Sequence, residues 1–266
     1  LAQSPQGRPA VYARPVLWSV ERGEPVSRDE LVPLALATHR PQERWLFLNM
    51  VSSVDGATTV GGESTPLADG DDRAMFMALR AACDAVLVGA GTVRAENYGP
   101  VRLDAPAQDH RRQMGLPPLP RLVIVSRSLY FDPEARVFED PERMPIVVTG
   151  ADAPAERRRA LRGKAEVLVT GEIGADPSHA LDALADRGYG VVLCEGGPTL
   201  NAALIELDLV DEIDLTLSPA FVGGGSARLL DGASEELRPF RLERLMVGEE
   251  MLFLRYVKEG SPPHRG

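Results

Sequence analysis

Residues 190–207 read GVVLCEGGPTLNAALIEL, and this stretch decides the fold. Its first part, Gly190–Glu195, is a short and largely apolar run, which is typical of a strand whose two faces are both covered. Two glycines follow, and Pro198 is well placed to open a helix that we expect over Pro198–Leu207. A buried strand that leads through a glycine turn into a helix indicates an α/β domain.

The same alternation of strand and helix recurs on both sides of this stretch. We expect strands at Trp45–Val51, Ala85–Gly89, Arg121–Ser126, Ile146–Thr149, Glu166–Thr170, Gly190–Glu195, Glu212–Ser218 and Met251–Val257. We expect helices at Gly70–Ala82, Pro154–Arg162, Pro177–Arg187 and Pro198–Leu207. No good helix separates the last two strands, so an antiparallel C-terminal strand is expected. The sequence therefore predicts an α/β fold with a mostly parallel central sheet and helices on both faces.

The chain divides into three predicted parts. Residues 1–43 are rich in Pro, Arg and Glu, and we expect an N-terminal arm with one short helix near Arg28–Ala37, opened by Ser27. Residues 44–258 are expected to form a single domain, and residues 259–266 a C-terminal tail. Within the domain, the charged and proline-rich stretch Pro100–Pro120 is expected to be a long loop.

Composition excludes several classes of partner. No apolar run approaches the roughly 18 residues of a membrane-spanning helix, and the first residues lack the apolar core of a secretory signal. We therefore expect a cytoplasmic protein that does not bind membranes. A formal net charge of −10 argues against binding to nucleic acid. Two cysteines and four scattered histidines offer no metal-ligand spacing, so no metal site is predicted.

Two glycine turns at strand ends are candidates for binding a nucleotide. In Gly89-Ala90-Gly91-Thr92-Val93-Arg94, two glycines allow close approach to the backbone, but Arg94 stands where a dinucleotide fingerprint has a third small residue. In Glu195–Asn201, the free amides at the helix start suit a pyrophosphate, and Glu195 ends its strand where ligands bind in open α/β sheets. Ordinary glycine-rich turns could also have these sequences.

Polar residues at other predicted strand ends suggest a cleft. Asn49–Gly56 ends with Asp55-Gly56, which suits a turn that lines a cleft or an Asx turn without a ligand. Ser126-Arg127 could hold a ribose 2′-phosphate, which would select NADPH over NADH. Arg80 and Arg102 are further anion ligands to consider. In such an arginine-rich chain, each arginine could equally be a solvated surface charge.

Five short motifs together resemble the reductase family of riboflavin biosynthesis, which has a dihydrofolate-reductase-like fold. The similarity runs from about Trp45 to Val257. The motifs are Ser53-Val54-Asp55-Gly56, Gly62-Glu63-Ser64, Leu79-Arg80-Ala81, Gly89-Ala90-Gly91-Thr92-Val93 and Glu195-Gly196-Gly197-Pro198-Thr199. Each motif is weak alone, but their order and spacing match the family.

The resemblance implies a reductase that moves a hydride from NADPH to C1′ of a ribosylaminopyrimidine 5′-phosphate, through its ring-opened imine, to give a ribitylamino product. The implied enzyme is similar to 5-amino-6-(5-phosphoribosylamino)uracil reductase, and a homodimer is expected. The implied cofactor positions are Ser52, Gly89, Gly91, Thr92, Glu96, Ser126, Arg127, Gly196, Gly197, Pro198, Thr199, Leu200 and Asn201. The implied substrate positions are Ser64, Arg80, Arg102 and Glu195, with the arginines expected to clamp the ribose phosphate. Asp55 or Glu96 could aid proton delivery, and the family pattern leaves this choice open.

The chain also departs from the family in the stretches that would line a substrate cleft. Pro66 stands where many relatives have an aromatic residue, and Glu96-Asn97-Tyr98 replaces a typical Asp-Asp-Pro. The segment leading to Arg102 is one residue shorter. No His-x-Glu or Pro-Cys-x-x-Cys motif of the accompanying zinc deaminase occurs, so a stand-alone reductase is expected.

Two alternatives remain open at this stage. A reductase of the same fold could act on dihydrofolate or another pterin-like ring, although a neutral ring would not need two arginines. A noncatalytic nucleotide-binding module could also keep this fold, in which case residues of the cleft would be lost. Most of those residues are present in this sequence.

Overall fold

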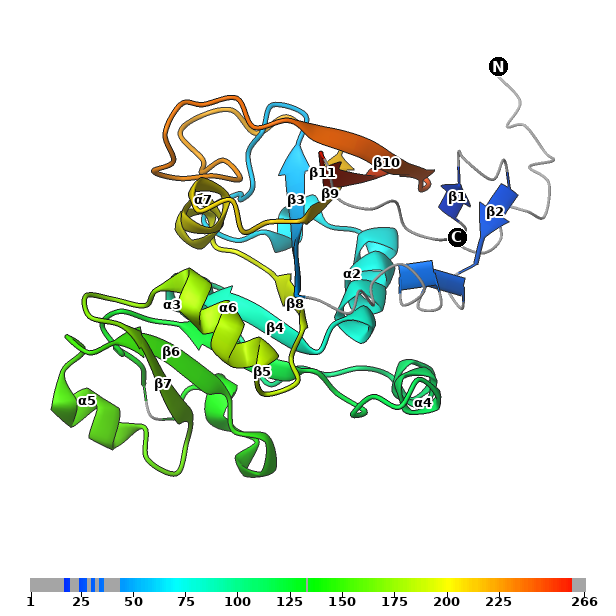
Figure 1. Ribbon diagram of the computed structural model, residues 1–266. Coiled ribbons are helices and arrows are strands. Elements are labelled where there is room, and N and C mark those ends of the chain that lie inside the picture. The colour runs from blue at the N-terminus through cyan, green and yellow to red at the C-terminus, as the bar shows by residue number, and fades with distance from the viewer. Residues whose placement is uncertain are drawn as a thin grey trace, which may run out of the picture.

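The computed structural model describes residues 17–19, 24–27, 30–31, 34–35, 44–132 and 134–259. Within these residues an 11-stranded sheet has the order β2-β1-β10-β11-β9-β3-β8-β4-β5-β6-β7 (Figure 1). Its parallel part consists of β3 (Trp45–Ser53), β4 (Ala85–Gly89), β5 (Arg121–Val125), β6 (Ile146–Gly150), β7 (Glu166–Gly171), β8 (Val191–Cys194) and β9 (Glu212–Ser218). The predicted strands of this part are confirmed to within two residues at each end.

The sheet continues beyond β9 with antiparallel strands. The strand predicted at Met251–Val257 is present as β11 (Leu252–Lys258), which pairs with β9. The sequence does not predict β10 (Phe240–Val247), which pairs with β11. Much of β10 is only partly covered and carries charged side chains, so its sequence lacks the apolar run of a central strand. The predicted N-terminal arm contributes β1 (Leu17–Ser19) and β2 (Glu24–Val26), which extend the sheet from β10.

Helices connect the parallel strands much as predicted. They are α2 (Gly70–Ala82), α3 (Ala90–Ala95), α4 (Ala105–Gln113), α5 (Ala155–Ala160), α6 (Pro177–Ala185) and α7 (Pro198–Glu206). Single turns of 3-10 helix lie at Thr65–Leu67, Arg136–Phe138 and Pro141–Arg143.

Two expectations about helices need correction or restriction. The predicted loop over Pro100–Pro120 is wrong, because α4 lies inside it. Asp104 caps this helix by accepting a hydrogen bond from the Ala107 amide, and a proline stands in the first turn, so the local signals were those of a helix start. The helix predicted near Arg28–Ala37 lies largely outside the described residues. Where it is described, Ser27 donates from N and Oγ to the side chain of Glu30, and the amide of Glu30 donates to the carbonyl of Ser27.

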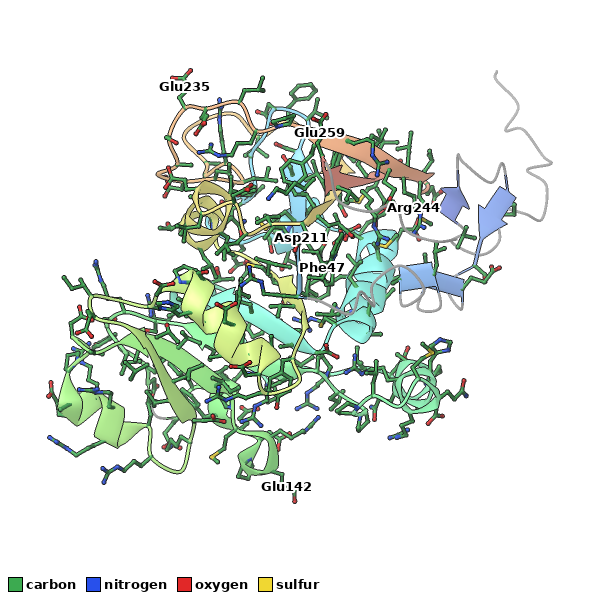
Figure 2. The ribbon with its side chains drawn as sticks, in the orientation of Figure 1. Phe47, Glu142, Asp211, Glu235, Arg244 and Glu259 are labelled. Carbon is green, nitrogen blue, oxygen red and sulfur yellow. The ribbon has the colours of Figure 1, made fainter. Side chains whose placement is uncertain are left out.

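Apolar side chains alternate between the two faces of the sheet and bury a core on each. On β3, Trp45 and Phe47 pack on the face that α2 covers, whereas Leu46 and Leu48 pack on the face that α6 and α7 cover. Figure 2 places Phe47 deep inside the molecule, while Glu142 and Glu235 project outward at its ends. The prediction of helices on both faces is thus confirmed.

The strand order creates a switch point at the carboxyl edge of the sheet. The chain passes from β3 through α2 to β4, and β8 later enters between these two strands. Crevices at such switch points, outside the carboxyl ends of the strands, are where open α/β sheets bind ligands. The turns that follow β3, β8, β4 and β5 therefore meet at one edge.

A fully buried arginine fastens α4 beneath α2. Arg111 donates from Nη1 to the carbonyl oxygens of Ala81 and Cys83, at 2.7 and 2.6 Å, and from Nε to that of Pro117 at 2.8 Å. The last carbonyls of a helix have no partner within the helix, so this guanidinium satisfies groups that burial would otherwise leave unpaired.

We expect Arg111→Met to lower the free energy of unfolding by about 3 kcal/mol, because buried carbonyls lose charged hydrogen bonds. The matched control is Arg112→Met, whose side chain is 52% exposed, and it should change stability by less than about 0.5 kcal/mol. Chemical denaturation of both variants measures the difference. Equal effects of the two substitutions would contradict the role given to Arg111.

Candidate active site

A buried ion pair lies at the carboxyl end of β8. Glu195 follows β8 directly, and Arg80 lies in the last turn of α2. Arg80 donates from Nε to Oε1 of Glu195 at 2.7 Å and from Nη2 to Oε2 at 2.8 Å, with the two side chains 12% and 5% exposed. This two-pronged geometry is the strongest that a guanidinium and a carboxylate can form.

Two aromatic residues complete this cluster. The hydroxyl of Tyr98 donates to Oε2 of Glu195 and accepts from Nη2 of Arg80. The guanidinium carbon of Arg80 lies 4.1 Å from the ring centre of Phe76 and 5.5 Å from that of Tyr98. Burial alone would lower the pKa of Arg80, but the attraction of Glu195 raises it above its usual value, so the guanidinium stays charged. Burial, and then the charge of Glu195, raise the pKa of Tyr98 well above its usual value, so the phenol keeps its proton.

The two predicted glycine turns contact each other beside this cluster. The amide of Gly89 donates to the carbonyl of Gly196 at 2.7 Å. A Cβ atom at Gly197 would stand 2.7 Å from Oγ1 of Thr92, and one at Gly89 would stand 3.3 Å from the amide nitrogen of Gly197. Gly89 and Gly197 also cap the N-termini of α3 and α7. Gly196 is buried in this crossing, whereas Gly197 and the start of α7 are partly exposed, so the free amides of this helix start can contact a ligand.

A second pair of predicted residues is joined across the cleft. Ser64 donates from its amide and from Oγ to Oε1 of Glu96, both at 3.0 Å. Glu96 caps the C-terminus of α3, so it ties the turn before α2 to the segment after β4. The structure therefore brings a predicted substrate residue and a predicted cofactor residue into contact.

Asp55 is held by three hydrogen bonds. Ser53 Oγ donates to it at 2.6 Å, and the amides of Val222 and Gly223 donate at 3.1 and 2.7 Å. These bonds, Ser53 first, lower the pKa of Asp55 to about 2. At neutral pH Asp55 is ionised and connects the turn after β3 to the loop after β9. Of the two carboxylates considered for proton delivery, Asp55 is therefore poorly suited.

The other predicted residues differ in how open they are. Arg102, Arg127, Thr199 and Gly91 are exposed, and no hydrogen bond or ion pair within the described residues joins Arg102 to the cluster. Ser52 is buried and donates to the carbonyl of Ser53. The hydroxyl of Ser126 is also buried and accepts from the amide of Leu129 at 3.0 Å.

Asn201 is turned inward. It is fully buried, and Nδ2 donates to the carbonyl of Leu229 at 3.2 Å and to the sulfur of Met50 at 3.3 Å. Its side chain thus holds α7 against the loop after β9. Leu200, the residue before it, is half-buried and packs on the core beneath α7.

The sequence alone does not assign Phe76 and Tyr98 to the site. Phe76 precedes Arg80 by four residues on α2, a spacing that places both side chains on one helix face and that could have suggested the contact. Tyr98 was noticed only as a departure from the family. Its contact with Glu195 joins residues 97 positions apart and depends on the fold.

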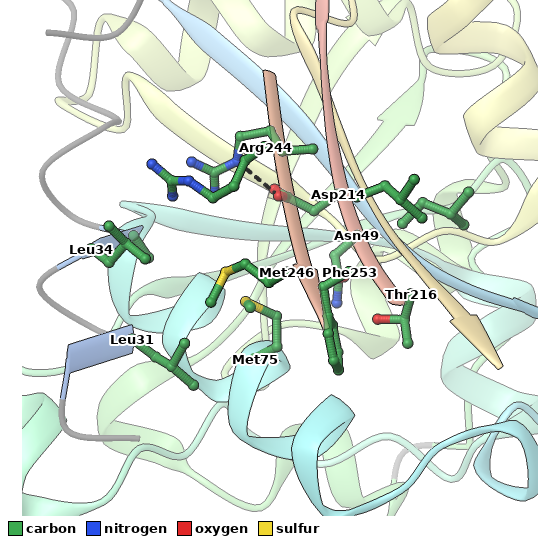
Figure 3. Close-up of a pocket in the computed structure, with 13 residues that line it drawn as sticks. Leu31, Leu34, Asn49, Met75, Asp214, Thr216, Arg244, Met246 and Phe253 are labelled. Carbon is green, nitrogen blue, oxygen red and sulfur yellow. Dashed lines mark hydrogen bonds and ion pairs between the residues drawn. The ribbon is translucent and has the colours of Figure 1, made fainter. Parts of the chain in front are cut away.

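A cavity lies elsewhere, between the N-terminal residues and the antiparallel part of the sheet. Figure 3 shows Leu31, Leu34 and Met75 around it, with Asp214 and Thr216 of β9 on its floor. Oδ1 of Asp214 accepts a hydrogen bond from Arg255 at 2.9 Å. None of the predicted site residues lines this cavity.

The described residues contain no group of three or more His, Cys, Asp and Glu side chains placed to hold a metal ion. None of their helices combines the length and apolar character that crossing a membrane requires.

The fold and the site define a class of protein: an α/β domain of the dihydrofolate-reductase-like type, with a cluster of polar side chains at the carboxyl edge of its sheet. Residues 44–249 match the family described as RibD C-terminal domain, and the chain belongs to that family.

Named relatives agree with this assignment. The chain is 32% identical over 209 residues to the 2,5-diamino-6-ribosylamino-4(3H)-pyrimidinone 5′-phosphate reductase of Archaeoglobus fulgidus, covering 77% of this chain and 94% of that protein. It is 31% identical over 222 residues to the reductase of the same name from Methanothermobacter thermautotrophicus, covering 80% and 98%. A crystal structure of a pyrimidine reductase-like protein from Corynebacterium diphtheriae superposes with a TM-score of 0.76 at 29% identity, covering 87% of this chain and 98% of that one.

The bonds to Asp55 predict a pH-dependent contribution to stability. Because folding lowers its pKa from 3.8 to about 2, the ionised carboxylate stabilises the fold above about pH 4, and this contribution is lost as the pH falls toward 2. We expect Asp55→Asn to melt at a lower temperature than the parent protein near neutral pH, with the gap narrowing in acid. Melting temperatures measured between about pH 7 and pH 3 check this expectation. A gap independent of pH would show that the charge of Asp55 is not what stabilises the loop.

Proposed function

We propose that the protein is an NADPH-dependent reductase of riboflavin biosynthesis that converts a ribosylaminopyrimidine 5′-phosphate into its ribitylamino form. The observation that carries this proposal is the buried cluster of Arg80, Glu195 and Tyr98 beside the crossing of the two glycine turns. The relatives named as reductases of such a substrate support it, because they align along most of their own length.

The cofactor would lie along the carboxyl edge of β8, β4 and β5. The amide of Gly197 and the start of α7 suit its pyrophosphate, with Thr92 beside them. Arg127, exposed after β5 and next to Ser126, suits the 2′-phosphate that distinguishes NADPH from NADH. The bound cofactor supplies the hydride that reduces C1′ of the ribosyl group.

For the substrate, the structure favours a division between ring and phosphate. The charge of Arg80 is already compensated by Glu195, so a phosphate placed there would gain little net attraction. We therefore assign the phosphate to the exposed Arg102, and a ring N–H of the pyrimidine to the carboxylate of Glu195. Ser64 and Glu96 would line the same side, and Glu96 is the remaining candidate for handling a proton.

The proposal also covers oligomeric state, location and domain organisation. We expect a homodimer in the cytoplasm, and a chain divided into an arm, a reductase domain and a tail. The pterin reductase and the noncatalytic module remain the alternatives that the first experiment separates.

Turnover of offered substrates tests the proposal most directly. We expect NADPH oxidation with the diaminopyrimidinone ribosyl phosphate or its deaminated uracil form, and none with dihydrofolate. The loss of absorbance of the reduced nicotinamide measures the rate, and the same assay with NADH tests cofactor preference. Turnover of dihydrofolate alone would identify the protein as a reductase of pterin-like rings. Cofactor binding without any turnover would favour the noncatalytic nucleotide-binding module.

Gly197→Ala tests where the cofactor lies. The new methyl group would meet Oγ1 of Thr92 at 2.7 Å, and the turn must shift to relieve this contact. An overpacking cost of 1–3 kcal/mol is typical, so we expect NADPH affinity to fall by about tenfold or more. Gly190→Ala is the control, since a Cβ there has no neighbour within 4 Å. Fluorescence titration measures both, and unchanged affinity in Gly197→Ala would place the pyrophosphate elsewhere.

A further inference from the structure

The oxygen atoms of Glu195 are not equally available. A carboxylate offers about four lone pairs, two on each oxygen. Oε2 accepts from Arg80 Nη2 at 2.8 Å and also from the hydroxyl of Tyr98, whereas Oε1 accepts from Arg80 Nε at 2.7 Å. Three of the four positions are thus filled by the protein. The one that remains is on Oε1, in a side chain that is only 5% exposed.

We infer that Tyr98 is a specificity-determining residue: by occupying Oε2 of Glu195, it limits this carboxylate to one N–H donor of the pyrimidine ring. The inference rests on the proposed function and concerns the identity of its substrate. Tyr98 acts through Glu195, so it is a positioning residue.

The local structure holds Tyr98 in this position. The preceding residue, Asn97, has a left-handed backbone with φ of 45°, a conformation that asparagine tolerates better than most residues. Arg136 donates to the carbonyl of Asn97 at 3.1 Å, and the amide of Tyr98 donates to the carbonyl of Val93 at 3.0 Å. The ring of Tyr98 packs against the core and beside the guanidinium of Arg80.

This arrangement matters because the two pyrimidines of the proposed reaction class differ at one edge. The diaminopyrimidinone presents a ring N–H beside an exocyclic amino group, which are two adjacent donors that a free carboxylate would bind with both oxygens. The deaminated ring presents the N–H beside a carbonyl oxygen. With Oε2 occupied, Glu195 accepts the ring N–H of either substrate and gives the extra amino group no partner. The parent protein should therefore discriminate only weakly between the two rings.

Tyr98→Phe removes the hydroxyl and keeps the ring beside Arg80. We expect Oε2 to become available, so that the kcat/KM ratio of the diaminopyrimidinone to the deaminated ring rises about tenfold over that of the parent, the effect of one added hydrogen bond. The change should arise in KM, with NADPH affinity within about twofold of the parent. Because the ratio compares two substrates on one protein, a general loss of stability would not move it.

Two matched variants and a second substitution complete the test. Tyr130→Phe removes the hydroxyl of a tyrosine that is 65% exposed, and Phe76→Leu removes the other aromatic neighbour of Arg80. Both should leave the ratio unchanged. Tyr98→Leu also frees Oε2 and should shift the ratio in the same direction as Tyr98→Phe.

The outcomes separate this inference from the proposed function. If the parent turns over at least one of the two pyrimidines and Tyr98→Phe leaves the ratio unchanged, the role of Tyr98 is overturned while the proposed function stands. A ratio that falls, or that shifts equally in Phe76→Leu, also overturns it. If the parent turns over neither pyrimidine, the proposed function fails and the inference falls with it.

Discussion

The buried pair of Arg80 and Glu195 is the interaction on which the site depends. Two charges removed from water are costly unless each is paired with good geometry and their other hydrogen-bonding positions are filled. The two-pronged contact and the hydroxyl of Tyr98 fill three of the four accepting positions of Glu195, and the ring of Phe76 lies beside the guanidinium of Arg80. Because Arg80 comes from α2, Glu195 from the end of β8 and Tyr98 from the segment after α3, this cluster holds three separate segments of the chain together.

That pair could not form without the order of the strands. β8 enters the sheet between β3 and β4, although about 100 residues of chain separate it from β4. Its insertion places Glu195 beside the end of α2 and brings the turn at Gly196-Gly197 against Gly89. Glycines are needed where these turns cross, because a side chain at Gly197 would overlap Thr92.

The polar residues around the cleft then divide into two kinds. One kind forms side-chain hydrogen bonds that hold loops together, and it consists of Asp55, Asn201 and Ser126. Arg102, Arg127 and Thr199 are exposed, and their side chains are available to a ligand. Family patterns alone place both kinds at binding positions, and their hydrogen bonds within the protein separate them.

Much of this protein follows from its sequence. Continuously apolar strands such as Val191–Leu193, with Pro198 opening a helix after two glycines, determined the α/β fold, and the order of five motifs determined the family. The sequence pattern did not predict α4, because its charged residues and proline resemble a loop. It also did not predict β10, because this partly exposed strand has no apolar run. Only the tertiary structure decided that the hydroxyl of Tyr98 occupies Oε2 of Glu195 and that Glu195 compensates the charge of Arg80. It also decided that Asp55 joins two loops by hydrogen bonds. These facts depend on contacts between residues far apart in the chain, and no local periodicity or spacing encodes them.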